Sequence, residues 1–198
     1  MTAARRLATA SNAGRAAPGR RNRVRIIAGT WRSRVVHFPD SAGLRPTPDR
    51  VRETLFNWLG QYLDGQACLD LFAGSGALGF EALSRGAKRV VMVEQDRETA
   101  RALRESAAAL QAANLEIVQS DALRFLDASP ERFDIAFVDP PYDSKLVGPA
   151  FERLPRHLNP GARVYAESAK RIELAPPWRA VREDRAGAVH FGLYECTP

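Results

Sequence analysis

The feature that most constrains this chain is an apolar run, residues 133–138, that ends abruptly at Asp139-Pro140-Pro141-Tyr142. The length of the run and its β-branched and aromatic content are typical of a buried strand. Neither proline can donate a hydrogen bond to a neighbouring strand, so we expect Asp139 to stand at the carboxyl end of the strand. In an open α/β sheet this edge is where ligands bind. The alternative interpretation is a proline turn with a surface tyrosine.

The four residues after this strand suit methyl transfer to an amino group of a nucleobase. The lone pair of such an amine is delocalised, and acceptors aimed at its two hydrogens favour the pyramidal form that attacks. Asp139 offers a carboxylate and Pro140 a carbonyl, while the ring of Tyr142 can stack on an extruded base. We therefore expect Asp139, Pro140, Pro141 and Tyr142 to form the catalytic site. The stretch resembles the Asp/Asn-Pro-Pro-Tyr motif of amino-group methyltransferases, which act on adenine, cytosine or guanine.

The positive charge of the chain is concentrated near its N-terminus. Residues 1–39 contain nine arginines and no acid, although the whole chain has a net charge of only +6. Residues 1–22 lack hydrophobic periodicity, so we expect a disordered basic arm that tethers nucleic acid. A passive tail and a transit peptide are the alternatives. We divide the rest into an RNA-facing extension, residues 23–62, and a methyltransferase domain, residues 63–198.

The extension is predicted to contain a hairpin and a helix. Two short apolar runs, residues 24–28 and 31–38, are joined at Gly29 and are typical of a hairpin. Thr47 suits the N-cap of the following helix and Pro48 its first position. The residues expected on the buried face of this helix recur at helical spacing and are Val51, Leu55, Trp58, Leu59 and Tyr62.

Cationic and aromatic side chains of the extension are candidates for RNA binding. Arginines at the start of the helix lie off its apolar face, and an arginine beside a tryptophan in the hairpin gives the basic and aromatic mixture that grips RNA. Covering the core is the alternative role of the tryptophan. The expected RNA-contacting set is Trp31, Arg32, Arg45, Thr47, Arg50 and Arg52.

Residues 45–59 extend the resemblance to a particular family. They read Arg-Pro-Thr-Pro-Asp-Arg-Val-Arg-Glu-Thr-Leu-Phe-Asn-Trp-Leu, which is similar to the signature of the bacterial small-subunit (16S) ribosomal RNA guanine-N2 methyltransferases. The likeness covers the chain from about residue 24 to its C-terminus. It implies methylation of the exocyclic N2 of a guanine in 16S rRNA, of the guanine(966)-N(2) type. The implied partner is 16S rRNA in the small ribosomal subunit or its assembly intermediate, and we expect the protein to act as a monomer.

A glycine-rich loop after the strand predicted at residues 68–72 indicates a nucleotide-containing cofactor. Its glycines formally match the dinucleotide fingerprint, so spacing alone does not choose between NAD and S-adenosylmethionine. Asp70, Asp121 and Asp139 fall at predicted strand ends, where they would repel a pyrophosphate but attract a sulfonium and an ammonium. We therefore expect S-adenosylmethionine, with S-adenosylhomocysteine as product. The expected cofactor-binding set is Asp70, Phe72, Ala73, Gly74, Ser75, Gly76, Gly79, Glu94, Gln95, Asp121, Ala122 and Asp139.

Strands alternate with helices up to residue 167, and a hairpin is predicted from residues 178–182 and 188–196. This order is typical of a doubly wound, mostly parallel sheet with an antiparallel edge, the Rossmann-like architecture of class I methyltransferases. No apolar run reaches membrane length, so we expect a cytoplasmic protein. The histidines and cysteines are scattered, and we expect no metal site. The rival functions are a DNA adenine-N6 methyltransferase, a non-catalytic RNA-binding assembly factor and, weakest, a nicotinamide oxidoreductase.

Overall fold

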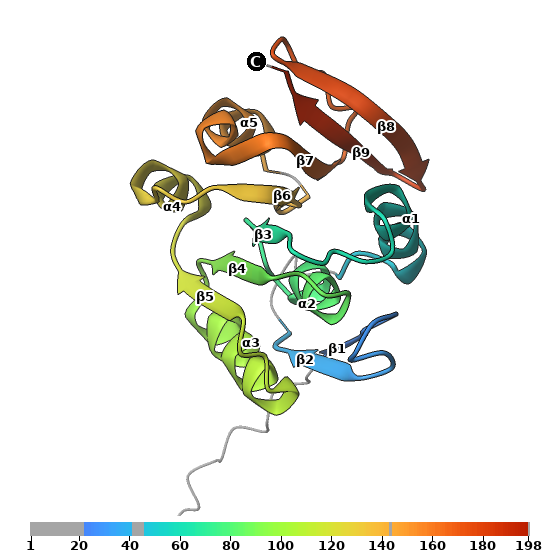
Figure 1. Ribbon diagram of the computed structural model, residues 1–198, viewed down its shortest axis with the longest axis vertical. Coiled ribbons are helices and arrows are strands. Elements are labelled where there is room, and N and C mark those ends of the chain that lie inside the picture. Colours follow the sequence, from blue (N-terminus) through green and yellow to red (C-terminus); the bar gives the residue numbers. More distant parts are fainter. Residues whose placement is uncertain (1–21, 41–45, 143, 198) are drawn as a thin grey trace, which may run out of the picture.

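The computed structural model describes residues 22–40, 46–142 and 144–197. Within these ranges the chain folds around a seven-stranded sheet of order β5-β4-β3-β6-β7-β9-β8 (Figure 1). Five neighbouring strands are parallel, and at one edge β9 pairs antiparallel with β7 on one side and with β8 on the other. The parallel strands are β3 (Ala67–Asp70), β4 (Arg89–Glu94), β5 (Leu115–Gln119), β6 (Phe133–Val138) and β7 (Leu158–Ser168). The two strands of the edge hairpin are β8 (Trp178–Ala186) and β9 (Val189–Cys196).

The order of the strands creates a switch point between β3 and β6. From β3 the chain runs outward through β4 and β5, then returns to the other side of β3 and continues through β6 and β7. At such a point the crossover helices leave on opposite faces, which opens a crevice at the carboxyl ends of the two strands. The predicted doubly wound sheet with an antiparallel edge is therefore confirmed, and β9 lies between β7 and β8.

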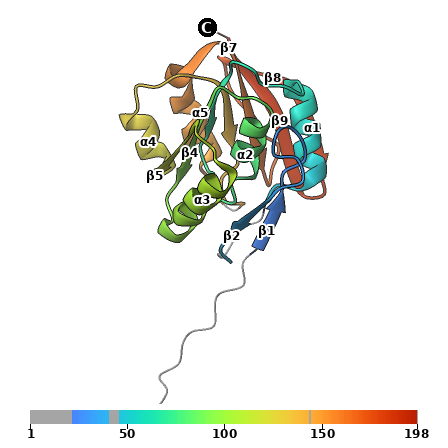
Figure 2. The same cartoon turned by 60° about the horizontal axis from the view of Figure 1, so that its bottom comes forward.

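Helices cover both faces of the sheet (Figures 1 and 2). One face carries the helices that follow the first two parallel strands, together with the N-terminal helix and a separate two-stranded ribbon. These elements are α1 (Asp49–Leu59), α2 (Ala77–Ser84), α3 (Arg97–Leu110), β1 (Asn22–Arg25) and β2 (Val35–Phe38). The other face carries α4 (Ala122–Ala128) and α5 (Val147–Arg153), with the 3-10 turn Leu154–His157. No helix in the described ranges is both long and apolar enough to cross a membrane.

The two-residue period of the strands divides the core between these faces. On β7, Val164 and Ala166 pack with the cluster under α4 and α5, whereas Tyr165 packs with the cluster under α1 and α2. The side chain of Glu167 therefore points to the same face as Tyr165. The alternation of faces along β7 therefore decides which polar side chains meet at the carboxyl edge of the sheet.

The N-terminal ribbon and α1 share a core with the main sheet. Val24 and Val36 of the ribbon belong to the same apolar cluster as Cys68 of β3. Gly29 has a φ of +81°, and a Cβ there would collide with the backbone carbonyl of Ser84. Contact this close requires glycine, and it seats the turn of the ribbon directly on the end of α2.

Several local expectations for the extension are wrong. The hairpin strands are shorter than predicted because residues 26–34 turn onto α2, where the backbone N–H groups of Ile27 and Ala28 donate to Glu81. Tyr62 lies beyond the helix and is 75% exposed, since α1 ends at Leu59. Pro48, rather than Thr47, occupies the N-cap position of α1.

Candidate active site

Four carboxylates gather at the carboxyl edge of the parallel sheet. Asp70 ends β3, Glu94 ends β4, Asp139 follows β6 directly, and Glu167 is the penultimate residue of β7. The strands β3, β6 and β7 are adjacent, so Asp70, Asp139 and Glu167 come from neighbouring strands on both sides of the switch point. Of these four acids, sequence reasoning singled out all except Glu167.

Asp70 is a buried carboxylate that anchors the start of α2. Its Oδ2 accepts a hydrogen bond of 3.0 Å from the backbone N–H of Gly79. A Cβ at Gly79 would collide with the side chain of Met92 and come within 3.1 Å of that same oxygen, which explains the glycine. Burial, with smaller contributions from the charges of Asp139 and Glu94, raises the pKa of Asp70 to about 7 against the opposing hydrogen bond from Gly79.

Glu94, the last residue of β4, holds the glycine-rich loop against that strand. Its Oε2 accepts from the N–H of Gly74 at 2.9 Å, and its Oε1 accepts from the N–H of Asp96 at 2.8 Å. Gly76 has a φ of +75°, a left-handed conformation that favours glycine, and stands at the N-cap of α2. Burial is the main cause that raises the pKa of Glu94. The loop thus presents backbone and an acid to the same crevice.

The other predicted cofactor residues lie along the same edge. Ala73 is buried, Phe72 packs partly against the core under α4, and Gln95 is exposed directly after β4. Asp121 is the N-cap of α4, and its Oδ1 accepts from the N–H of Arg124 at 3.0 Å. These predicted residues therefore stand at the carboxyl ends of three adjacent strands, β3, β4 and β5.

Asp139 is bound by a residue of the N-terminal extension. The hydroxyl of Thr47 donates to its Oδ2 across 3.1 Å, and Thr47 itself is buried. Burial raises the pKa of Asp139 to about 6, and this hydrogen bond opposes the rise. Two predictions from separate parts of the sequence, a catalytic aspartate and an RNA-facing threonine, thus meet in one contact.

The residues after Asp139 form the outer part of the site. Pro140 is buried and Pro141 is exposed. The ring of Tyr142 is 51% exposed, and its hydroxyl donates to the carbonyl of Ala188, in the turn between β8 and β9, at 3.5 Å. An exposed aromatic ring beside a partly buried carboxylate provides a surface on which a base can stack.

Glu167 is the site residue that sequence reasoning missed. Strands β6 and β7 pair in register at Val138 and Ala166, so the next pair along the strands is Asp139 and Glu167. The hydroxyl of Tyr165 donates to Oε1 of Glu167 at 2.8 Å. Burial and the charge of Asp139 raise the pKa of Glu167 to about 8. The sequence placed Glu167 at the end of a strand, but the register that aligns it with Asp139 is not visible in the sequence.

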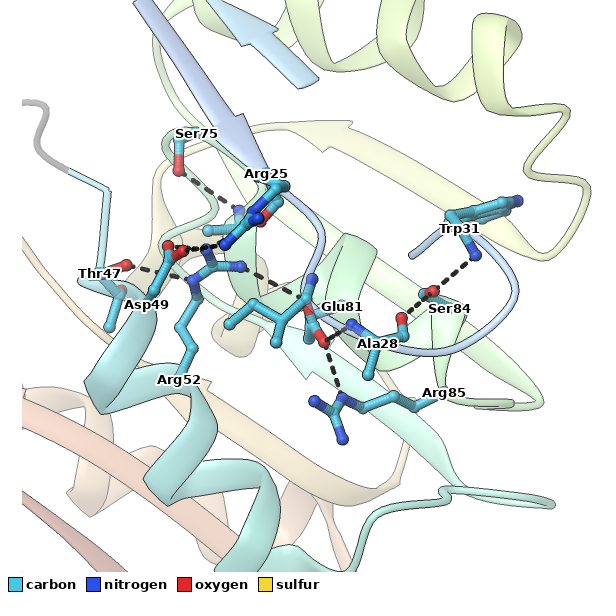
Figure 3. A network of polar contacts seen from close by, with 12 residues as sticks. Arg25, Ala28, Trp31, Thr47, Asp49, Arg52, Ser75, Glu81, Ser84 and Arg85 are labelled. Atoms are coloured by element: carbon cyan, nitrogen blue, oxygen red, sulfur yellow. Dashed lines mark hydrogen bonds and ion pairs between the residues drawn. The ribbon is translucent and has the colours of Figure 1, made fainter. Parts of the chain in front are cut away.

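Arg52 forms the centre of a buried network instead of an RNA contact (Figure 3). Its side chain is only 1% exposed, so our expectation that it lies off the buried face of the helix is wrong. Its guanidinium pairs with Glu81 of α2 at 3.3 Å and with Asp49 at 2.6 Å. Its Nε donates to the carbonyl of Thr47 at 3.2 Å. A buried carboxylate on α2 thus draws Arg52 inward, and we no longer assign it to RNA.

The remaining candidates for RNA contact occupy different positions. Arg32 and Arg50 are exposed. Trp31 is half-buried against the core, and its backbone N–H donates to the hydroxyl of Ser84 at 2.9 Å. Arg45 lies outside the described residues.

A cavity of about 370 Å³ beside Thr47 is lined by Arg23, Val24, Arg25, Val35, Pro46, Thr47, Pro48 and Asp49.

No group of three or more His, Cys, Asp or Glu side chains in the described ranges is arranged to hold a metal ion. The acids at the sheet edge are instead bound to backbone N–H groups and hydroxyls. Burial is the main cause that raises the pKa of Asp70, and the charges of Asp139 and Glu94 add to the rise, so this edge of the sheet is suited to a cationic ligand.

Comparison with known proteins assigns the family. Residues 24–195 match the family model described as conserved hypothetical protein 95. The chain is 42% identical over 186 residues to ribosomal RNA small subunit methyltransferase D of Haemophilus influenzae, an alignment that covers 90% of this chain and 96% of the relative. It is 44% identical over 179 residues to the Escherichia coli K12 protein of the same name, covering 87% and 89%. The chain belongs to the ribosomal RNA small subunit methyltransferase D family.

Solved structures agree with this family and with its fold. The putative methyltransferase yhhF from Escherichia coli superposes with a TM-score of 0.79 at 43% identity, covering 87% of this chain and 97% of that one. The Thermus thermophilus 16S rRNA N2 G1207 methyltransferase superposes with a TM-score of 0.69 at 24% identity, covering 90% and 50%. The second likeness concerns the fold alone. The predicted family and fold class are therefore confirmed.

Proposed function

We propose that this protein transfers a methyl group from S-adenosylmethionine to the exocyclic N2 of a guanine in 16S rRNA of the small ribosomal subunit. The observation that carries the proposal is the position of Asp139, a partly buried acceptor at the switch point followed by two prolines and an exposed tyrosine ring. The names of the family members at 42% and 44% identity support small-subunit rRNA as the substrate. Such a substrate places the protein with ribosomes in the cytoplasm, where we propose that it acts as a monomer.

The acids of the crevice fit the proposed cofactor. Burial and the acidic neighbours Asp139 and Glu94 raise the pKa of Asp70. A positive group placed among these acids therefore relieves the repulsion between them. A pyrophosphate would add to that repulsion, which disfavours NAD. In this assignment Asp70 holds the ammonium group, the loop from Gly74 to Gly79 lies against the methionine portion, and Glu94 holds the ribose. As the resemblance implies, Asp121 and the N–H of Ala122 hold the adenine edge.

Bound S-adenosylmethionine would supply an electrophilic methyl group on a sulfonium. The chain supplies orientation: Asp139 and the carbonyl of Pro140 accept hydrogen bonds from the guanine amine, and Tyr142 supports the ring. Thr47 already occupies Oδ2 of Asp139, which leaves Oδ1 for the amine. The carboxylate of Asp139 is partly buried, and a bound guanine would exclude the remaining water, so we propose that positioning and desolvation provide most of the rate.

Two rival functions are less well supported. The Pro-Pro-Tyr motif does not by itself choose guanine over adenine. Within the described residues, however, each crossover between parallel strands contains one α-helix, without a separate domain for reading a DNA sequence. A non-catalytic assembly factor would gain nothing from a cluster of buried acids whose raised pKa values lower stability at neutral pH.

The decisive experiment maps the methylated base. Small-subunit particles and naked 16S rRNA, both taken from cells that lack the gene, are incubated with protein and labelled cofactor, digested with nuclease and analysed by mass spectrometry. We expect N2-methylguanine at a single position, guanine 966 if the family resemblance extends to the target, and labelling slowed by on the order of 10²–10³ with Asp139→Ala. Labelled N6-methyladenine, or preferential labelling of duplex DNA, would overturn the proposal.

A further inference from the structure

A second carboxylate stands beside Asp139, and accepting the substrate amine does not require it. Strands β6 and β7 run parallel and pair Phe137 with Tyr165, then Val138 with Ala166. Asp139 and Glu167 are the next pair, and both lie on the face of the sheet that carries Phe137 and Tyr165. The two acids are therefore neighbours, and Glu167 is buried while Asp139 is partly buried.

Each hydroxyl beside this pair has only one hydrogen, so the hydrogen-bond donors can be counted. Tyr165 donates its single hydroxyl hydrogen to Oε1 of Glu167 at 2.8 Å. Thr47 donates its single hydroxyl hydrogen to Oδ2 of Asp139 at 3.1 Å. The Thr47 oxygen can still accept, and Thr47 is also within hydrogen-bonding reach of Glu167.

One proton shared between the two acids satisfies all these groups, because Thr47 can turn its hydrogen toward whichever acid is ionised. With a proton on Glu167, the acid donates to Thr47, Thr47 donates to Asp139, and Tyr165 donates to the free oxygen of Glu167. With both acids ionised, the one hydrogen of Thr47 serves only one of them, and two neighbouring anions repel each other. Such a pair resolves the conflict by retaining one proton.

We propose that Glu167 carries this proton in the active enzyme and acts, through the Thr47 hydroxyl, as the positioning residue that keeps Asp139 ionised with its Oδ1 directed at the substrate. The identity of the substrate amine rests on the proposed function, whereas the hydrogen-bond chain does not. Thr47 lies in the N-terminal extension, but its hydroxyl is hydrogen-bonded to the carboxylate of Asp139.

Burial assigns the proton to Glu167, which is 7% exposed, whereas Asp139 is only partly buried and so keeps its charge more easily. Burial and the charge of Asp139 raise the pKa of Glu167 to about 8, whereas that of Asp139 is raised only to about 6. Across the sheet, β9 places the apolar ring of Phe191 opposite Glu167, and His190 lies one pair further along. On the other side Asp70 adds a third acid, whose own pKa is raised by Asp139.

The first test compares Glu167→Gln with Glu167→Ala in single-turnover methyl transfer from pH 6 to 9. Glutamine keeps a donor for Thr47 and an acceptor for Tyr165, so we expect its rate at pH 7 to fall by less than about tenfold. Alanine breaks the chain and should cost about tenfold to a hundredfold, the value of a charge-assisted hydrogen bond converted to a rate. The wild-type rate should decline above pH 8, where Glu167 loses its proton. Glu167→Gln should lack that decline.

Deprotonation of the guanine itself affects all variants equally, so the difference between the two profiles isolates Glu167. Glu116→Gln, which changes an exposed acid on β5 at the far edge of the sheet, is the matched control and should follow the wild-type profile. Thr47→Val should slow transfer as Glu167→Ala does, and the double variant should be no slower than either single one, since both act through one hydrogen bond. An alkaline decline that persists in Glu167→Gln, or additive losses in the double variant, would overturn the proposal.

A second measurement needs neither substrate nor cofactor. Carbon-13 NMR of the side-chain carboxyl of Glu167, assigned by its loss in Glu167→Gln, should show ionisation near pH 8. Titration near the ordinary glutamate value of about 4.3 would refute the proton assignment. If the wild-type protein methylates no guanine, the proposed function fails, while the NMR titration still decides the role of Glu167.

Discussion

Arg52 and Glu81 form an ion pair at 3.3 Å in which neither side chain is more than 1% exposed. Glu81 also accepts hydrogen bonds from the backbone N–H groups of Ile27 and Ala28, at 2.8 and 3.0 Å, and from Arg85 at 2.8 Å. The pair therefore joins three parts of the molecule: α1, the turn of the N-terminal ribbon and the helix that follows the glycine-rich loop (Figure 3). Through the carbonyl of Thr47, Arg52 also fixes the residue that holds Asp139.

Arg52→Met should destabilise the protein strongly. Removing one partner of a buried ion pair leaves the other charge without compensation and costs about 3–5 kcal/mol. Glu81 keeps Arg85 and two backbone donors, so we expect about 3 kcal/mol. Urea denaturation of the wild type and the variant measures the loss in the free energy of unfolding.

Arg50→Met is the matched control on the same helix. Arg50 is exposed, and a substitution there should change the free energy of unfolding by no more than about 0.5 kcal/mol. If Arg50 contacts RNA as predicted, the same variant should bind rRNA more weakly. Equal stability of Arg50→Met and Arg52→Met would refute the role assigned to the buried network.

Asp139→Ala should slow methyl transfer with little change in cofactor affinity. The variant removes a preorganised acceptor but leaves Asp70 and Glu94 in place, and loss of one such hydrogen bond costs on the order of 10²–10³ in rate. Asp139→Asn keeps an acceptor oxygen and should lose less. Single-turnover rates and calorimetric affinities for S-adenosylmethionine separate the two effects. A single-turnover rate equal to wild type in Asp139→Ala would remove Asp139 from the mechanism.

The strands and the acids at their ends could be predicted because their signals are local. The run at β6 has clear bounds because its prolines cannot continue a sheet, and the structure ends β6 at Val138. Asp70, Glu94 and Asp139 follow apolar runs that are buried on both faces, so their place at the carboxyl edge follows from strand direction alone. The five parallel strands and the terminal hairpin were predicted from the same kind of signal.

The remaining features depend on tertiary contacts. Arg52 stands among polar residues near a helix start, and its inward direction follows from Glu81, which is 29 positions away in the chain. Glu167 faces Asp139 because of the register between β6 and β7, which no local pattern encodes. Thr47 has the sequence of an N-cap, but its hydroxyl bonds with a residue 92 positions later. Long-range polar partners thus overrode local propensity at each of these positions.

Binding of S-adenosylmethionine should release protons near neutral pH. The pKa of Asp70 is raised to about 7 by burial and by acidic neighbours, so the free protein holds a proton there below that pH. A cationic ligand requires the ionised form, and affinity should therefore fall as pH drops below 7, by up to about tenfold per pH unit. Calorimetry in buffers of different ionisation enthalpy counts the protons released.

Asp70→Asn is the control for this proton linkage. It should bind the cofactor more weakly and lose most of the pH dependence between pH 6 and 7, because the titrating group is gone. Wild-type affinity that stays constant from pH 5.5 to 8 would show that Asp70 is not the residue that faces the ammonium group.

The arginines before the described fold should determine how strongly RNA binding depends on salt. Residues 1–21 lie outside the described ranges, and they contain Arg5, Arg6, Arg15, Arg20 and Arg21. Deleting residues 1–21 leaves intact the elements that begin with β1 at Asn22. Each arginine–phosphate interaction that the deletion removes should reduce the slope of log K against log salt by ~0.7 to 0.9. We expect a reduction of roughly two to four units, because the five arginines do not all bind phosphate at once.

A full-length variant with these five arginines changed to glutamine separates charge from chain length. If charge is responsible, its slope should match that of the deletion, and both proteins should approach wild-type affinity at high salt. The methylated nucleotide should remain the same in both, since phosphate contacts position the protein while the pocket around Asp139 and Tyr142 chooses the base. RNA binding across a salt series, paired with mapping of the methylated base, tests both statements. Equal slopes in all three proteins would make the arm passive, and a shifted methylation site would show that the arm helps to select the target.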